Sequence, residues 1–362
     1  MGGKAFSATL PATSFPRIPP AIYYRHLKPR TTPKIKTLYS IVSTPAEAPL
    51  KASHGDLDLL VCEPLNSAEV SPAEVQTLLG ARFMVPEPGN RTSSYAVLIE
   101  PGEWRALGHD AEENAARLAA EAAGQPEIYY QVDVHVCADK AEWERIHFFH
   151  GNGDTGMILG LLARNNGLTL GTKGLKARCS TSSNLSESMD EIMEYMGLSM
   201  ERCRAGFSTT LEIFEWLGSS SFFNPLTFRS QGRGIKKVKS DRTMYAEFTE
   251  WAGNQEPKVG GAMSREARIQ HALVRFGKKG EYDRLLKEDA DRALLKNSFN
   301  GHKVQEWTGI KAWSSLHTMM EAVRTELGGN EGIVALLNVE GEDGIREVVL
   351  RAKERLLGVT EG

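Results

Sequence analysis

The segment at residues 55–61, GDLDLLV, constrains the fold more than any other part of the sequence. Alternate side chains of a β-strand point to opposite faces of its sheet. On such a strand Leu57 and Leu59 share one face, and Asp56 and Asp58 share the other. The segment therefore predicts a sheet with one buried face and one face that carries two neighbouring carboxylates.

A third carboxylate is expected from the alternating segment at residues 128–136. Its side chains Tyr130, Val132 and Val134 form an apolar face, and Asp133 lies on the opposite face. If the two strands are neighbours, three carboxylates meet at one point of the sheet and repel one another. Divalent cations relieve this repulsion most simply, so the pattern predicts a Mg²⁺ or Mn²⁺ site.

Capping and turn signals around these strands predict the order βαββαβ. Ser71 and Glu74 form the capping box of one helix, and Asp110 and Glu113 form that of another. The expected elements are strands at 57–61, 82–85, 95–99 and 128–136, with helices at 72–80 and from 110 to about 124.

The second half of the chain has a helical pattern. From about Asn184, apolar residues recur at helical spacing, as in MDEIMEYMG, TTLEIFEWLG, ARIQHALVRFG, SSLHTMMEAVRTELGG and IREVVLRAKERLLG. A chain of 362 residues is long enough for two domains. We therefore predict an α+β protein, with a mixed β-sheet domain over residues 1–180 and a mostly helical domain over residues 181–362.

The motifs GGKAF, KxSxGDLDLLV and YYQVDVHV, all within residues 1–180, resemble the polymerase-β-like nucleotidyltransferase superfamily, in particular its uncharacterised fungal and phage branch. The resemblance implies Asp56 and Asp58 as ligands of two catalytic metal ions, Mg²⁺ or Mn²⁺. It implies Asp133 as the third ligand and as a base toward the acceptor hydroxyl.

The resemblance leaves two alternatives for the residues that hold the nucleoside triphosphate. The family's glycine motif corresponds to Gly2 and Gly3 with Lys4, some fifty residues before the paired acids. The second alternative is the turn that directly precedes those acids, where Lys51, Ser53 and Gly55 would contact the phosphates.

The activity implied by the resemblance is transfer of a nucleoside monophosphate from a triphosphate to an acceptor hydroxyl. The acceptor would belong to RNA, a protein or a small molecule. The alternative is a catalytically inactive module of the same fold that binds nucleotide or RNA.

The amino-terminal region is basic. Residues 1–46 contain seven basic residues and no acidic one: Lys4, Arg17, Arg25, Lys28, Arg30, Lys34 and Lys36. We expect an ordered arm that presents positive charge to an anionic partner. A mitochondrial targeting peptide is the minor alternative, because the prolines between residues 11 and 33 disfavour the amphipathic helix such peptides need.

A second basic stretch, over residues 229–242, is expected to form an exposed loop. Its side chains would contact the phosphates of a nucleic acid, or would simply be solvated. They are Arg229, Arg233, Lys236, Lys237, Lys239 and Arg242.

Several other features are expected to be structural. His135 should hydrogen-bond to a neighbour, and the segment around His147 and His150 should form a loop leading into a helix capped by Asp154 or Thr155. The methionine-rich run at 189–200 should belong to a core, as should the tryptophans of the second half: Trp216, Trp251, Trp307 and Trp313.

The sequence shows neither a membrane helix nor a cysteine motif, and this indicates the expected compartment. Every apolar run is far shorter than the ~20 residues of a membrane helix. The four cysteines are scattered, without the spacing of a zinc or redox motif. We therefore expect an intracellular protein of the cytoplasm or nucleus that does not contact membranes.

Overall fold

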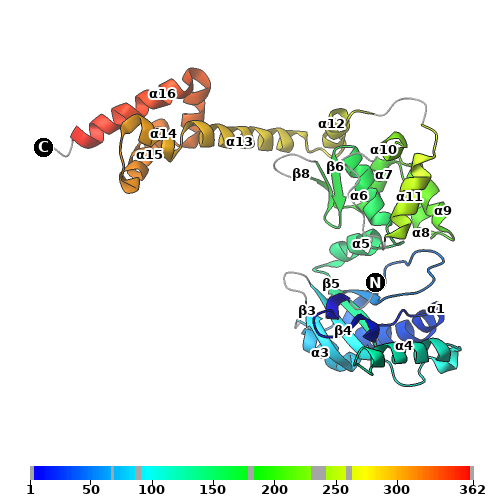
Figure 1. Ribbon diagram of the computed structural model, residues 1–362. Coiled ribbons are helices and arrows are strands. Elements are labelled where there is room, and N and C mark those ends of the chain that lie inside the picture. Colours follow the sequence, from blue (N-terminus) through cyan, green and yellow to red (C-terminus); the bar gives the residue numbers. More distant parts are fainter. Residues whose placement is uncertain are drawn as a thin grey trace. The chain divides into compact units, whose positions relative to one another are not determined.

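The computed structural model of the chain describes residues 4–66, 69–86, 91–177, 183–229, 242–257 and 263–358. It divides the chain into two compact units (Figure 1). The first unit comprises residues 1–177 and 184–272, and the second contains the helices from Leu273 onward. The first unit therefore extends beyond residue 180, where the sequence pattern suggested a boundary.

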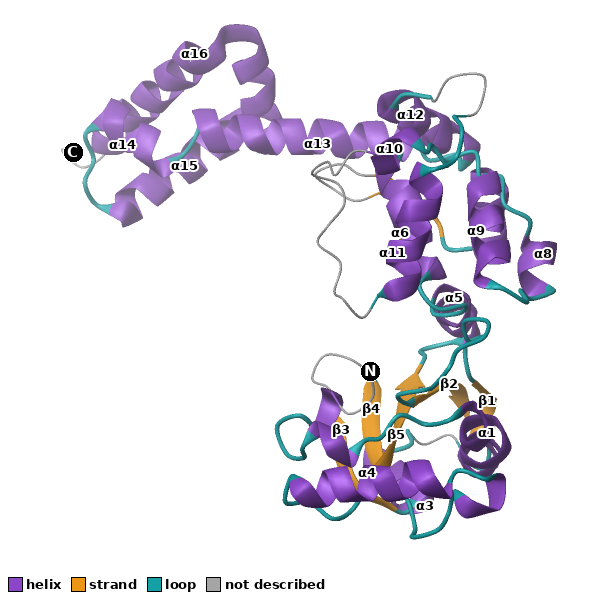
Figure 2. Ribbon diagram, turned by 45° about the vertical axis from the view of Figure 1, so that its right-hand side comes forward, coloured by secondary structure: helices purple, strands orange, loops and turns teal. Residues whose placement is uncertain are grey.

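The first unit contains a mixed five-stranded sheet in the order β1-β2-β5-β4-β3 (Figure 2). Strands β2 and β5 are parallel, whereas the other neighbouring pairs are antiparallel. With helices α3 (Pro72–Leu79) and α4 (Asp110–Ala122), the chain from β2 to β5 confirms the predicted order βαββαβ. The strands are β1 (Tyr39–Ser43), β2 (Leu57–Pro64), β3 (Ala81–Pro86), β4 (Thr92–Leu98) and β5 (Tyr129–Val136).

One face of this sheet is buried under helices. Leu57 and Leu59 of β2 and Val132 of β5 pack in one apolar core with side chains of α3 and α4. The amino-terminal helices complete this layer: α1 (Pro20–Ile22), the π-helix η3 (Tyr23–Leu27) and α2 (Lys28–Ile35). The opposite face, which carries Asp58 and Asp133, is covered in part, because Phe6 clusters with Tyr129 there and Ile146 clusters with Leu60.

The amino-terminal region is ordered, as expected, and it forms helices although its prolines were expected to disfavour an amphipathic helix. Pro20 occupies the first helical turn, where a missing N–H costs nothing. Pro29 follows the π-helix, in which the Lys28 amide bonds five residues back to the Tyr23 carbonyl. Pro33 lies inside α2. Burial of apolar side chains against the sheet outweighs the local cost of these prolines.

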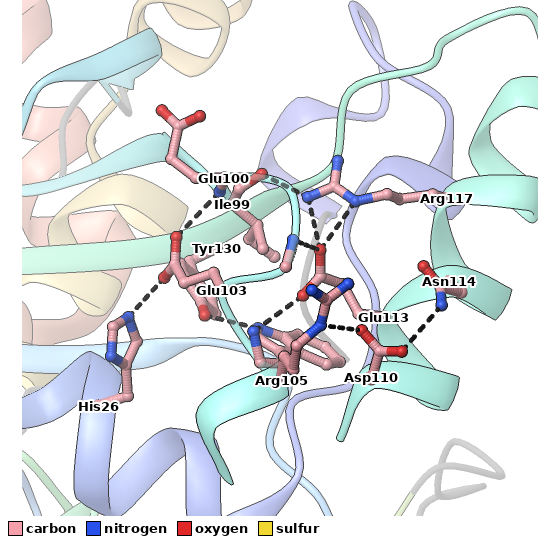
Figure 3. A network of polar contacts seen from close by, with 12 residues as sticks. His26, Ile99, Glu100, Glu103, Arg105, Asp110, Glu113, Asn114, Arg117 and Tyr130 are labelled. Atoms are coloured by element: carbon pink, nitrogen blue, oxygen red, sulfur yellow. Dashed lines mark hydrogen bonds and ion pairs between the residues drawn. The ribbon is translucent and has the colours of Figure 1, made fainter. Parts of the chain in front are cut away.

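The predicted capping box of Ser71 and Glu74 is confirmed, whereas that of Asp110 and Glu113 is wrong. His109 is the N-cap of α4 and makes no side-chain capping bond. The Glu113 carboxylate is buried and accepts hydrogen bonds from the backbone amides of Gly102 and Trp104, at 2.7 and 2.8 Å (Figure 3). Burial by itself would raise the pKa of Glu113. The hydrogen bonds from these amides and from Arg117 together outweigh burial, so the pKa lies below its ordinary value and the carboxylate is ionised.

Replacement of Glu113 by alanine is expected to destabilise the first unit by about 3 kcal/mol. Two backbone N–H groups and the Arg117 guanidinium, which bonds Glu113 at 2.9 Å, would lose their acceptor. Urea denaturation followed by circular dichroism measures the effect. Glu121→Ala, an exposed change on the same helix, is the control and should cost less than about 0.5 kcal/mol. Equal effects of the two variants would contradict this role of Glu113.

The remainder of the first unit is largely helical and includes a small sheet, β6-β7-β8, that the sequence pattern did not predict. The methionine-rich run is core, as expected, since Met189, Met193 and Met196 are buried, and Trp216 is buried as well. The elements are α5 (Lys140–Phe149), α6 (Thr155–Asn165), β6 (Leu168–Gly171), β7 (Gly174–Ala177), β8 (Ser183–Ser186), α7 (Met189–Met196), α8 (Met200–Arg204), α9 (Thr210–Ser219), α10 (Leu226–Arg229), α11 (Thr243–Gly253) and α12 (Arg265–Arg275).

The second unit is helical, as predicted, and has its own apolar core. Trp307 packs against this core, but Trp313 is 60% exposed, so its predicted core position is wrong. The helices are α13 (Lys279–Ser298), α14 (Gly301–Thr308), α15 (Trp313–Leu327) and α16 (Asn330–Gly358), the last kinked at Gly341. No helix in the described part of the chain has the length and apolar character needed to cross a membrane.

Candidate active site

The structure brings two of the three predicted carboxylates side by side. Asp58 of β2 and Asp133 of β5 are register partners on adjacent parallel strands. Neighbouring strands lie about 4.8 Å apart, and paired residues point to the same face. Asp56 directly precedes β2 and, by alternation, lies on the same side as Asp58.

The pKa of Asp58 is affected by the negative charges around it. Its side chain reaches solvent, but the surrounding walls restrict its hydration. This partial burial first, and then the negative charges of Asp56, Asp133 and Glu47, raise the pKa of Asp58 to about 8. A nearby cation would lower that pKa and relieve the repulsion.

Asp133 is held by a residue of its own strand. The Gln131 side-chain amide donates to both carboxylate oxygens of Asp133, at 3.0 and 2.8 Å. In the residues that the structure describes, no group of three or more His, Cys, Asp or Glu side chains is arranged to hold a metal ion. The oxygen donors fit a hard divalent cation by their chemistry, but Asp133 would have to exchange its Gln131 contact for the metal.

Asp56 and Asp58 line a cavity of about 520 Å³ that also has a basic side. The predicted turn residues Lys51, Ser53 and Gly55 line it, as the second alternative for the triphosphate site requires. Its walls also carry two arginines that this alternative did not include, Arg17 and Arg242. The cavity thus places carboxylates and cations around one space.

Arg17 was not predicted as a site residue. Its guanidinium donates to the backbone carbonyl of Ser53 at 2.6 Å and to the Ser53 hydroxyl at 3.1 Å. The backbones of Ile18 and His54 bond to each other in both directions, which fixes the amino-terminal segment against the turn. Because both acceptors of Arg17 are neutral, its positive charge remains available to an anion in the cavity.

Arg242 is held at the cavity by an acid from another segment. Its guanidinium donates to buried Asp154 at 2.6 Å, and the other oxygen of Asp154 accepts from the Tyr245 amide at 3.2 Å. Asp154 is the N-cap residue of α6 but makes no side-chain capping bond, and the Thr155 hydroxyl donates to the Asn152 carbonyl. Asp154 therefore occupies the predicted N-cap position, but its carboxylate serves a long-range contact and does not cap the helix.

The other predicted phosphate ligands are described only in part. Gly2 and Gly3 lie outside the described residues, and Lys4 begins the short helix η1 (Lys4–Phe6). Phe6 packs against Ala96 and Tyr129. By alternation along β5, Tyr129 lies on the same face of the sheet as Asp133. The segment at Phe6 therefore lies over the face that carries the acids, which is compatible with the first alternative for the triphosphate site.

Only the ends of the basic stretch are described. Arg229 is bound within the fold, since its guanidinium donates to the carbonyls of Gly253 and Gln255 at 2.9 and 2.7 Å. Arg233, Lys236, Lys237 and Lys239 lie outside the described residues.

The histidines near the site are mainly structural. His135 bonds through Nδ1 to the Thr92 hydroxyl at 2.7 Å, as predicted, and burial lowers its pKa. His150 lines the cavity, and burial lowers its pKa as well. His147 stacks on Trp143, with ring centroids 5.0 Å apart.

A second cavity, of about 740 Å³, adjoins the first. Ala46 lines both cavities, and the Asn152 amide donates to the Ala46 carbonyl at 2.6 Å. The stacked rings of Trp143 and His147 line this second cavity. Asp56 and Asp58 line the smaller of these two cavities and Asp133 is the register partner of Asp58, so we place the candidate site there.

Gly153 lines the first cavity and lies close to Met244 and Ala48, where a side chain would not fit. Its φ of +68° favours glycine, and a Cβ here would lie 2.8 Å from the Met244 sulfur and 3.0 Å from the Ala48 Cβ. Gly153→Ala should therefore cost about 2 kcal/mol more than Gly124→Ala, whose φ is +80° but whose Cβ would meet nothing within 4 Å. Thermal denaturation compares the two. Equal losses would show that the close approach at Gly153 is unimportant.

In comparisons with known proteins, no protein-family model matches the chain and no curated protein matches it. The function must therefore be argued from the site itself.

Proposed function

We propose that the chain is a metal-dependent nucleotidyltransferase. The observation that carries this proposal is the register of β2 and β5, which places Asp58 beside Asp133 with Asp56 on the same side. The cavity at Asp56 and Asp58 also contains Lys51, Arg17 and Arg242. Carboxylates suit divalent cations, and the basic side chains suit phosphates.

In this proposal Asp56, Asp58 and Asp133 hold one or two Mg²⁺ or Mn²⁺ ions. The ions would supply charge neutralisation for the attacking and leaving oxygens of an in-line displacement. The acceptor hydroxyl forms a bond to the α-phosphorus while the bond to the β-phosphate oxygen breaks and pyrophosphate leaves. Asp133 takes the proton of the attacking hydroxyl.

The basic residues position the triphosphate and compensate its charge. Arg17 presents its guanidinium from the turn at Ser53, and Arg242 presents its own from the buried carboxylate of Asp154. Lys51 lies on the same turn that leads into β2. A phosphate chain between these cations and the acids would keep its α-phosphorus close to Asp58 and Asp133.

Incubation with α-labelled nucleoside triphosphates, Mg²⁺ or Mn²⁺, and RNA, protein and small-molecule acceptors tests the proposal. The unmodified protein should transfer label, and the Asp56→Asn, Asp58→Asn double variant should not. Glu121→Gln, an exposed change on α4, is the matched control and should behave like the unmodified protein. Equal labelling by the double variant and the unmodified protein would refute the enzymatic proposal.

Binding measurements on the unmodified protein distinguish the enzyme from the alternative, an inactive binding module. Calorimetric titration with triphosphate should show binding that requires Mg²⁺ if the chain is an enzyme. Binding without the cation, weakening steeply as salt is raised, would instead indicate a module that contacts polyanions through its arginines and lysines.

A further inference from the structure

Glu47 lines the candidate cavity, but the proposed reaction uses it neither as a metal ligand nor as a phosphate ligand. It lies between β1 and β2. Its carboxylate oxygen Oε2 forms an ion pair with the Lys51 ammonium. Although burial raises the pKa of Glu47, the Lys51 ammonium holds it below its usual range, so the carboxylate is ionised. In this state Lys51 is occupied by an internal anion.

Glu47 is fixed from its other side. The hydroxyl of Tyr23, which is completely buried, donates to Glu47 Oε1 at 3.0 Å. Lys51 has a long flexible side chain that is about one third exposed, whereas Glu47 is 21% exposed. Of the two partners, Lys51 is the one that can move toward the centre of the cavity.

His54 lies behind this pair with unused hydrogen-bonding capacity. Its ring is completely buried and stacks on Tyr23, with centroids 3.8 Å apart and planes 8° apart. In the described part of the chain neither ring nitrogen has a hydrogen-bond partner. Its Nδ1 lies 3.8 Å from Glu47 Oε2, the oxygen that Lys51 occupies. That separation is too long for a hydrogen bond, but a shift of less than about 1 Å would form one.

We propose that Glu47 holds Lys51 while the cavity is empty, and that His54 replaces Lys51 on Glu47 when Lys51 binds a polyphosphate. This inference rests on the proposed function for the identity of the anion. For a carboxylate that is largely shielded from water, loss of a charged donor is costly unless another donor takes its place. His54, with its proton on Nδ1, is that donor. Glu47 and His54 are thus positioning residues, and a ligand must carry enough negative charge to take Lys51 from Glu47.

Calorimetric titration of the full chain with inorganic tripolyphosphate and Mg²⁺ tests the exchange. Glu47→Gln should tighten binding by about three- to tenfold, because Lys51 no longer has to leave an ionised partner. His54→Phe keeps a ring against Tyr23 but removes the replacement donor, and it should weaken binding by about threefold. In the Glu47→Gln background, His54→Phe should have little effect.

The Lys51→Met background separates this exchange from a general charge effect. If Glu47 acts through Lys51, Glu47→Gln has no effect on binding once Lys51 is removed. An equal gain with and without Lys51 would overturn the proposal, since Glu47 would then act only by repelling the ligand. Weaker or unchanged binding by the single variant Glu47→Gln would also overturn it.

Failure of the proposed exchange at Glu47 can be distinguished from failure of the proposed function. Tripolyphosphate binding that follows these variants, together with no transfer of label, would contradict the enzymatic proposal and leave the exchange standing. Absence of tripolyphosphate binding to the unmodified protein would contradict both. Thermal denaturation of each variant verifies that it is folded.

Discussion

Asp58→Asn is expected to raise the melting temperature of the cation-free protein at pH 9 by roughly 2–4 °C, with little change at pH 4. The ordinary pKa of Asp58 is 3.8, and the folded protein raises it to about 8 through burial and through the charges of Asp56, Asp133 and Glu47. Between these values the folded state binds a proton that the unfolded state does not. Stability contributed by the protonated carboxyl is therefore lost as pH rises from about 4 to about 8.

The expected size is modest because the Asp58 side chain reaches solvent, which screens the repulsion. A shift of roughly 2–4 °C corresponds to about 1 kcal/mol in a unit of this size. Differential scanning fluorimetry across the pH range measures it. Adding Mg²⁺ at pH 8 should stabilise the unmodified protein but not Asp58→Asn. If the difference in melting temperature between Asp58→Asn and the unmodified protein does not grow with pH, Asp58 does not lie among repelling carboxylates.

Asp133→Asn is expected to lower the rate of label transfer by about a hundredfold or more. It removes one metal ligand and the group that accepts the proton of the acceptor hydroxyl, each of which supports the transition state. The loss should appear in kcat more than in KM, because the proposed triphosphate contacts come from the cavity residues Lys51, Arg17 and Arg242. Single-turnover assays with α-labelled triphosphate measure it.

Glu121→Gln again provides a control, since this exposed side chain lies on α4, which packs on the face of the sheet opposite to the acids. A rate for Asp133→Asn within about threefold of the control would exclude Asp133 from the chemistry, because loss of a metal ligand costs far more. A raised KM with unchanged kcat would indicate that Asp133 only helps to bind the nucleotide.

Local sequence pattern predicted the part of the site that depends on strands. The alternation in residues 55–61 and 128–136 is sufficient to place Asp58 and Asp133 on one face, opposite the apolar core, and the βαββαβ order is confirmed. Strand β1 was not predicted, because its residues Tyr39–Ser43 show little alternation and are defined by pairing with β2. The helix at Pro20–Ile35 was missed because packing against the sheet overrides the prolines.

The basic side of the cavity depends on contacts between residues far apart in sequence. Arg17 reaches the site through a bond to Ser53, 36 residues away, and Arg242 through Asp154, 88 residues away. Glu113 was assigned to a capping box by its spacing, but its carboxylate bonds to the loop at Gly102 and Trp104 instead. Composition and periodicity carry no information on such pairings, so only the fold could reveal them.

We propose that Asp56, Asp58 and Asp133 bind divalent cations next to a triphosphate. Crystals grown with Mn²⁺ and a non-hydrolysable nucleoside triphosphate, measured for anomalous scattering, test it most directly. We expect Mn²⁺ peaks in contact with all three carboxylates, with Asp133 released from Gln131 and the phosphates against Lys51. Density for the nucleotide without Mn²⁺ at these acids, or Mn²⁺ bound elsewhere on the chain, would contradict the claim.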